Sequence, residues 1–107
     1  MIMFTSFQNS KPKEILPGFI ARFIHTKTQT FSLVEITKGA ILPEHFHLNE
    51  QVSQVIEGTF ELNINGIIKI CTPGDIALID SNVPHSGVAL TDCTILDVFT
   101  PVREDYK

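Results

Sequence analysis

The sequence predicts an all-β protein, and three features of the chain support this fold class. Short segments that suit β-strands alternate with turn residues along the chain, as is typical of sheets. No long stretch shows the i, i+3, i+4 spacing of hydrophobic residues that indicates an amphipathic helix. A length of 107 residues with 43% hydrophobic content is typical of one compact domain with its own core. Strands of this length and spacing favour a sandwich or a barrel.

The first expected elements are an N-terminal arm and two strands. Residues 1–18 are interpreted as the arm, because prolines and a glycine interrupt them. Residues 19–25 and 31–37 are predicted to be strands on either side of a polar turn.

The middle of the chain shows the clearest strand pattern. Strands are expected at residues 51–57 and 59–63, on either side of Gly58. Around the second of these, apolar and polar side chains alternate in the order Phe60, Glu61, Leu62, Asn63, Ile64, Asn65. One face of this strand is therefore expected in the core and the other in water.

Turn residues define the remaining strands. Asn65-Gly66 predicts a tight hairpin, because both residues tolerate positive φ, so the chain should return over residues 67–71. Pro73-Gly74-Asp75 marks the next turn. The last strands are expected at residues 76–79, 85–90 and 94–100.

Charge and composition argue against several classes of partner. The formal net charge is −4, and the Lys and Arg residues are scattered, whereas nucleic-acid binding relies on a concentrated basic surface. No stretch reaches membrane-spanning length, and the N-terminus does not resemble a signal peptide. We therefore expect no nucleic-acid or membrane partner and a cytoplasmic location. Cys71 and Cys93 are expected to be reduced, partly buried thiols.

A possible metal site is the most informative feature of the chain. His45 and His47 would share one face of an extended strand and could direct two imidazoles at one ion. The pair alone is equally compatible with a solvated strand edge. Its spacing to Gln51 and to His85 favours a site, since imidazole and amide oxygen suit divalent first-row metals and leave a coordination position open. His25 is interpreted as a strand-end histidine.

These residues resemble the motifs of the cupin family. Gly39, five residues, His45-Phe46-His47, three residues, Gln51, six residues and Gly58 are similar to the first cupin motif. The second motif is looser, with Gly74, Asp80, Asn82, His85 and Ala89 in its places. Asp80 replaces a proline, Ala89 an asparagine, and Asn82 a glycine, although Asn tolerates the left-handed region. The resemblance covers residues 33–100 and implies a double-stranded β-helix, the cupin or jelly-roll barrel, with the ion inside.

A smaller group within the cupins is more similar still. His45-x-His47-x-x-Glu50-Gln51, residues 82–87 and the tail at residues 97–106 resemble the pectin-degradation cupins of the KdgF type. That resemblance implies a metal-dependent enzyme that converts 4,5-unsaturated monouronates, small anionic sugars, into linear keto uronates. It implies one divalent ion (Ni, Zn, Mn, Fe or Cu), a homodimer, the metal ligands His45, His47, Gln51 and His85, and Asp97 and Arg103 at the substrate.

Strand alternation supports Gln51 over Glu50 as the fourth ligand. Cupins usually provide this ligand three or four residues after the second histidine, and Glu50 should face the other side of the strand. A neutral amide also leaves the ion its full charge, which favours an anionic substrate.

Three residues of the tail are candidates for substrate contacts. Asp97 and Phe99 share one strand face, so Asp97 is predicted to act as the acid/base, and Phe99 to lie against the sugar ring. Arg103 presents a planar fork that could hold a carboxylate bidentately. The alternative interpretation is that these residues have no functional role: Phe99 would be an inward-facing residue of the last strand, and Arg103 an exposed charge near the C-terminus.

Two other functions remain open at this point. One is a different metal-dependent cupin enzyme, such as a dioxygenase or an isomerase. The other is a non-catalytic module that binds a sugar or another metabolite. The sequence does not distinguish pectin-derived from alginate-derived uronates.

Overall fold

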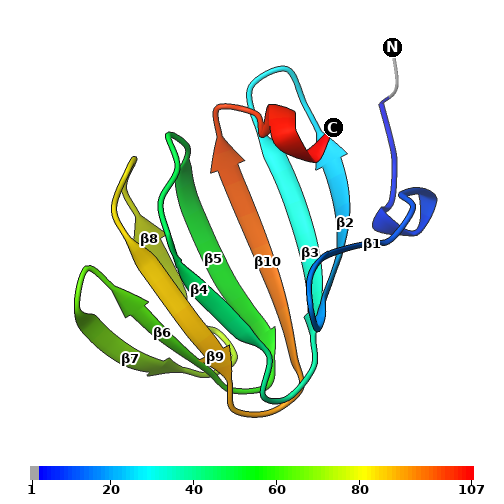
Figure 1. The fold of residues 1–107 in the computed structure, drawn as a ribbon. Coiled ribbons are helices and arrows are strands. Elements are labelled where there is room, and N and C mark those ends of the chain that lie inside the picture. The colour runs from blue at the N-terminus through cyan, green and yellow to red at the C-terminus, as the bar shows by residue number, and fades with distance from the viewer. Residues whose placement is uncertain (1–2) are drawn as a thin grey trace.

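Two antiparallel sheets pack against each other around the core (Figure 1). The computed structural model describes residues 3–107. Within them the strands are β1 (Lys13–Leu16), β2 (Phe19–His25), β3 (Thr30–Ile36), β4 (Ile41–His45), β5 (Glu50–Glu57), β6 (Phe60–Ile64), β7 (Ile67–Cys71), β8 (Ile76–Ile79), β9 (His85–Ala89) and β10 (Cys93–Thr100). The six-stranded sheet has the order β1-β2-β3-β10-β5-β8, and the four-stranded sheet has the order β4-β9-β6-β7. Two short 3-10 turns, η1 (Phe7–Asn9) and η2 (Glu104–Tyr106), lie near the ends.

The predicted all-β fold is confirmed, and most strand positions agree with the sequence pattern. Strands β2, β7 and β8 have the predicted bounds, and β3, β5, β6, β9 and β10 differ by one residue at one or both ends. The hairpin turn between β6 and β7 also forms as expected, because Asn65 has φ 51° and Gly66 has φ 89°. None of the helical segments in residues 3–107 has the length and hydrophobicity needed to cross a bilayer.

Two strands were missed in the sequence because both are short and contain or adjoin prolines. The expected arm contains β1, which pairs with β2 through a bulge between Glu14 and Leu16. Strand β4 contains Pro43. Both strands lie at the edge of their sheets, where proline is tolerated because an edge strand has backbone groups that pair with no neighbour.

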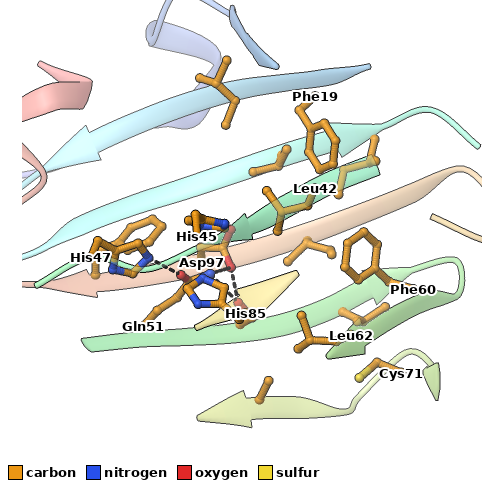
Figure 2. Close-up of a pocket in the computed structure, with 18 of the residues that line it drawn as sticks. Phe19, Leu42, His45, His47, Gln51, Phe60, Leu62, Cys71, His85 and Asp97 are labelled. Carbon is orange, nitrogen blue, oxygen red and sulfur yellow. Dashed lines mark hydrogen bonds between the residues drawn. The ribbon is translucent and has the colours of Figure 1, made fainter. Parts of the chain in front are cut away.

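The hydrophobic core lies between the sheets and occupies one end of the space that they enclose. Phe19 and Val34 from the six-stranded sheet meet Phe60 and Leu62 from the four-stranded sheet in one buried cluster. Both cysteines are free, and both are buried rather than partly buried. Figure 2 shows this apolar end, with Phe60, Leu62 and Cys71, separated from the histidines at the other end. The core therefore leaves one end of the sandwich for polar groups.

Candidate metal centre

Three histidines converge at the polar end of the sandwich. His45 ends β4 and lies opposite His85, the first residue of β9. Each of His45, His47 and His85 offers a ring nitrogen, and these atoms lie within 4.8 Å of one another. The ring centroid of His85 is 4.2 Å from that of His45 and 5.1 Å from that of His47. The cluster could therefore hold a metal ion.

The expectation that His45 and His47 share one strand is wrong. Strand β4 ends at His45, and His47 lies in the connection to β5. The alternation of exposure continues past the strand end, since Phe46 is 67% exposed while His47 is partly buried. Both imidazoles thus point inward although only one of them belongs to the strand.

Backbone carbonyls orient all three rings in the same way. The Nδ1 atoms of His45, His47 and His85 lie 2.8, 2.9 and 2.9 Å from the carbonyl oxygens of Pro43, Asn49 and Val83. A carbonyl oxygen can only accept a hydrogen bond, so each Nδ1 carries the proton and donates. Each Nε2 atom therefore keeps its lone pair, as a metal ligand requires.

Burial keeps two of these imidazoles neutral. It lowers the pKa of His85 from 6.5 to about 4, because the charged form loses hydration. Burial also lowers the pKa of His47, and the positive charge of Arg103 lowers it further. At neutral pH both rings are therefore ready to bind a cation without first losing a proton.

Gln51 of β5 joins the cluster from the opposite sheet. Its side chain is 8% exposed, and its Oε1 lies 3.0 Å from the Nε2 of His47. Its Nε2 donates to Ser53 Oγ at 2.9 Å and to Asp97 Oδ1 at 3.1 Å, which orients the amide. Glu50 is exposed. Gln51, as predicted from strand alternation, is the residue that faces the histidines.

The residues present fit a divalent transition-metal ion. With the amide and imidazole oriented in this way, Gln51 Oε1 and His47 Nε2 are two acceptors that face each other, and a cation would resolve that conflict. Within residues 3–107, the Nε2 of His85 is buried and has no hydrogen-bond partner, a state that costs about 1–3 kcal/mol when nothing binds. Imidazole nitrogen and amide oxygen are also ligands that such ions accept.

Asp97 of β10 lies behind Gln51 at the same cavity. It is opposite Ser53 of β5 in the sheet, and Ser53 Oγ donates a hydrogen bond to Oδ1 of Asp97. Oδ2 receives no hydrogen bond from the described residues. Burial raises the pKa of the Asp97 carboxyl, although the hydrogen bonds from Ser53 and Gln51 oppose that shift. Asp97 therefore holds a proton more readily than an ordinary aspartate.

Arg103 is buried beside the histidines, so the alternative of an exposed terminal charge is wrong. The residue is 9% exposed, and its guanidinium lies 4.7 Å from the ring centroid of Phe99 and 4.1 Å from that of Tyr106. Nε and Nη2 donate to the two carboxylate oxygens of Asp105 at 2.9 and 2.7 Å. The fork predicted to hold a substrate carboxylate is thus occupied by Asp105, which leaves Nη1.

Phe99 lines the cavity but is only 4% exposed. Its ring lies edge-on to that of His47, with centroids 5.6 Å apart. Phe99 therefore supports His47 and Arg103, and it offers little free surface to a sugar ring. His25, as predicted, ends β2 and its Nδ1 pairs with Thr30 Oγ1 at 2.8 Å.

The cavity itself has a volume of about 80 Å³. Its polar lining includes His45, His47, His85, Gln51, Ser53, Asp75, Asp97, Arg103 and Tyr106. Figure 2 shows the histidines, Gln51 and Asp97 gathered at this end. Sequence reasoning missed Ser53, although strand alternation puts it on the same face as Gln51. It also missed Asp105, although this carboxylate lies only two residues after Arg103 in the chain.

Comparison with known proteins assigns the fold to a family. Residues 32–99, most of the chain, match the family model described as Cupin domain. The chain belongs to the cupin family. The protein described as an RmlC-like cupin from Shewanella frigidimarina NCIMB 400 superposes with a TM-score of 0.93 at 30% identity, covering 100% of this chain and 97% of that one.

Two further relatives place this cupin in a narrower group. The pectin degradation protein KdgF of Dickeya dadantii (strain 3937) is 34% identical over 99 residues, which cover 89% of this chain and 90% of that protein. The structure of KdgF from Halomonas sp. matches with a TM-score of 0.92 at 26% identity and covers 100% of both chains. This cupin is therefore a small, KdgF-like member of the family.

Proposed function

We propose that this cupin promotes the ring opening of 4,5-unsaturated monouronates to linear keto uronates with the help of one divalent transition-metal ion. One observation carries the proposal: Asp97, a carboxyl that tends to hold a proton, lies in the same cavity as the three histidines and is linked to one of them, His47, through Gln51. The relationship to a protein named for pectin degradation supports the substrate class.

The proposed reaction is an isomerisation. The anomeric hydroxyl of the substrate loses a proton, the bond between C1 and the ring oxygen breaks, and C4 gains a proton as C5 becomes a ketone. No atom is gained or lost, and no electron acceptor is needed. The site therefore has to take a proton at one atom and deliver one at another, a task in which one positioned acid/base contributes about 10²–10⁴-fold.

Asp97 would carry the proton on Oδ2. Ser53 and Gln51 hold Oδ1, so Oδ2 remains for the substrate. Arg103 would bind the uronate carboxylate through Nη1, since Asp105 occupies Nε and Nη2. His45, His47, His85 and Gln51 would hold the ion, which when bound would polarise a substrate oxygen as a Lewis acid. Because all four of these ligands are neutral, the ion would keep its charge and attract the anionic substrate.

Two finer expectations also remain proposals. We propose a homodimer, because β1 is an edge strand of the six-stranded sheet and Phe4, which precedes it, is 90% exposed. Light scattering on the purified protein would decide this. A cytoplasmic location is compatible with two free thiols.

The decisive assay follows the absorbance of the conjugated C4=C5 bond when the metal-loaded protein meets a panel of unsaturated monouronates. We expect this absorbance to disappear faster than in the buffer control. Asp97→Asn should reduce turnover by about 10²-fold or more while the metal content stays unchanged. Full activity of Asp97→Asn would exclude its acid/base role. Binding without loss of absorbance would indicate a non-catalytic module, and uptake of oxygen would indicate a dioxygenase.

A further inference from the structure

Asn49 occupies the position between the two candidate ligands His47 and Gln51. It is buried, with 8% exposure. Its backbone carbonyl accepts the hydrogen bond from Nδ1 of His47 at 2.9 Å, and this bond leaves the Nε2 of His47 free to bind an ion. The main chain of Asn49 therefore acts on the candidate metal centre directly.

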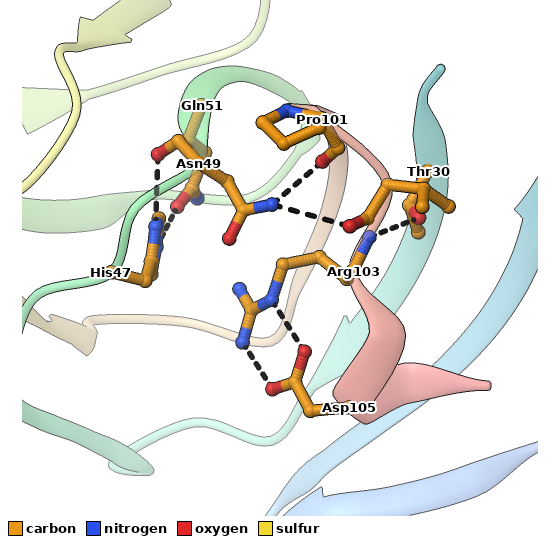
Figure 3. A network of polar contacts seen from close by, with 8 residues as sticks. Thr30, His47, Asn49, Gln51, Pro101, Arg103 and Asp105 are labelled. Atoms are coloured by element: carbon orange, nitrogen blue, oxygen red, sulfur yellow. Dashed lines mark hydrogen bonds and ion pairs between the residues drawn. The ribbon is translucent and has the colours of Figure 1, made fainter. Parts of the chain in front are cut away.

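The side chain of Asn49 reaches a different part of the chain. Its Nδ2 donates to the carbonyl oxygen of Pro101 at 2.6 Å and lies 3.5 Å from that of Val102. These two residues immediately precede Arg103, whose backbone N–H donates to Oγ1 of Thr30 at 2.9 Å. Figure 3 shows Asn49 on one side of this segment and Thr30 on the other. The segment that carries Arg103 is thus held from two sides.

Among residues 3–107, Nη1 of Arg103 makes no hydrogen bond, and this end of the guanidinium lies on the side of Asn49 in Figure 3. Nε and Nη2 are occupied by Asp105, and Phe99 and Tyr106 cover the flat faces. In Figure 3 the remaining nitrogen of the guanidinium points toward the side where His47 and Asn49 lie. A shift of residues 101–103 relative to Asn49 would therefore move the free end of Arg103 relative to the histidines.

We propose that Asn49 is a positioning residue that sets the distance between the metal centre and the free end of Arg103. The part of this inference that concerns substrate binding rests on the proposed function. A small anion held at two points, by an ion and by a guanidinium, needs a fixed spacing between them, and a displacement of about 1 Å can cost 10²-fold in rate. Partners that orient a metal-bound histidine typically contribute about 10–100-fold to metal affinity or activity.

The test uses Asn49→Ala in the full chain. We expect its dissociation constant for Zn²⁺ or Ni²⁺, measured by calorimetry, to rise about tenfold, because the carbonyl of residue 49 that holds His47 would lose its anchor on Pro101. At saturating metal, the KM for the unsaturated uronate should rise about tenfold, while kcat changes less than threefold. A side chain with only a structural role would lower the active fraction, and hence kcat, without this selective rise in KM.

Asn63→Ala is the matched control, because Asn63 also makes a side-chain hydrogen bond to the backbone, from Gly66 N to its Oδ1 at 2.9 Å. It lies at the β6-β7 turn, outside the cavity lining. This variant should keep both the metal affinity and the KM of the wild type. Unchanged metal affinity and KM in folded Asn49→Ala would overturn the proposal.

A second readout needs no substrate. Metal binding to the wild type should slow amide hydrogen exchange in residues 102–106, because the ion orders the segment through His47 and Asn49. In Asn49→Ala, and in the isosteric Asn49→Asp, whose carboxylate cannot donate to the two carbonyl oxygens, this metal dependence should disappear. Its persistence in the variants would overturn the proposal. If the wild type turns over no uronate, the proposed function fails, and the exchange experiment still decides the role of Asn49.

Discussion

Gln51 takes part in two interactions at opposite ends of one amide. Its carbonyl oxygen faces His47, and its NH₂ group donates to Ser53 and Asp97. A glutamine can do both because it combines an acceptor and a donor, whereas a glutamate has only acceptors when ionised. The neutral side chain at this position therefore allows a carboxyl and a metal ligand to share the cavity.

Gln51→Glu should leave metal binding intact and impair turnover. A glutamate oxygen would replace the amide donor beside Asp97 Oδ1, so two carboxyl groups would compete for one proton. We expect kcat to fall by about tenfold or more at neutral pH, with metal content by elemental analysis unchanged. Gln54→Glu adds the same charge on the other face of β5 and serves as the control. Wild-type kcat in Gln51→Glu would show that the donor is unnecessary.

The stability of the metal-free protein should decrease on acidification because of His85. Burial lowers its pKa from the ordinary 6.5 to about 4 in the fold, so the unfolded chain takes up the proton first. Stability is therefore lost as the pH falls from about 6.5 to about 4. The contribution of Asp97 to the pH dependence of stability has the opposite sign. Its raised pKa lets the folded form bind a proton more readily than the unfolded chain, so this contribution favours folding as the pH falls.

A comparison of two proteins isolates the contribution of His85. Asp97 is present in both the wild type and His85→Leu, so the difference between their unfolding free energies reports on His85. Urea unfolding of the metal-free proteins at several pH values should show that the wild type loses more stability in this range. Parallel pH curves would contradict the assignment of a buried, neutral imidazole.

At the scale of elements, strand pairing brings the site residues together. In the six-stranded sheet Asp97 lies opposite Ser53 and Phe99 lies opposite Gln51, so β5 and β10 present four site residues on one face. In the four-stranded sheet His45 of β4 lies opposite His85 of β9. Each pairing depends on register, because a shift of one residue would turn these side chains to the other face.

Gly58 sets the corner where the chain leaves β5 for the four-stranded sheet. It has φ +83°, and a Cβ there would collide with the carbonyl oxygen of Asp92 and lie 2.9 Å from the Cα of Cys93. Gly58→Ala combines backbone strain with overpacking, so we expect a loss of about 2–4 kcal/mol in the free energy of unfolding. Urea unfolding would measure it.

Gly74→Ala is the control for the strain alone. Gly74 has φ +95°, and a Cβ there would meet nothing within 4 Å. This variant should lose only about 1–2 kcal/mol. Equal losses in the two variants would mean that the close approach of β10 to Gly58 adds nothing to the loss in the free energy of unfolding.

At the scale of the whole molecule, the candidate ligands come from both sheets. His45 and His85 belong to the four-stranded sheet, Gln51 belongs to the six-stranded sheet, and His47 lies in the connection between them. A bound ion would therefore link the two layers at the end opposite the hydrophobic core. Metal binding and the stability of the sandwich should be coupled for this reason.

Metal should raise the melting temperature of the wild type but not that of His85→Leu. At a free metal concentration of about 100 times the dissociation constant, the gain is about 2.7 kcal/mol. Without metal, His85→Leu should lie within about 1–2 kcal/mol of the wild type, because it removes a buried nitrogen that has no partner. Thermal melts with added Ni²⁺ or Zn²⁺ and with a chelator would test this.

His25→Leu is the matched control, since His25 lies outside the histidine cluster. It should show the same metal-dependent shift as the wild type. A shift that survives in His85→Leu would place the ion elsewhere.

Local patterns in the sequence were sufficient to predict most of the strands, the hairpin at Asn65-Gly66 and the inward direction of the Gln51 side chain. Alternation and turn chemistry act between near neighbours, so one strand at a time can be predicted from them. They were insufficient for β1 and β4, where only the edge position explains how prolines are tolerated. They also misplaced His47, whose strand ends two residues earlier.

Contacts between distant segments were decided by the tertiary structure alone. Asn49 holds the chain at Pro101, and Thr30 accepts the hydrogen bond from the backbone N–H of Arg103. Ser53 fixes one oxygen of Asp97, and Val83 O orients His85 toward histidines that lie far from it in the chain. The sequence by itself determined which side chains face inward, because that depends on the period of a strand. Which of them touch depends on the register and packing of two sheets, and that information is not local to any segment.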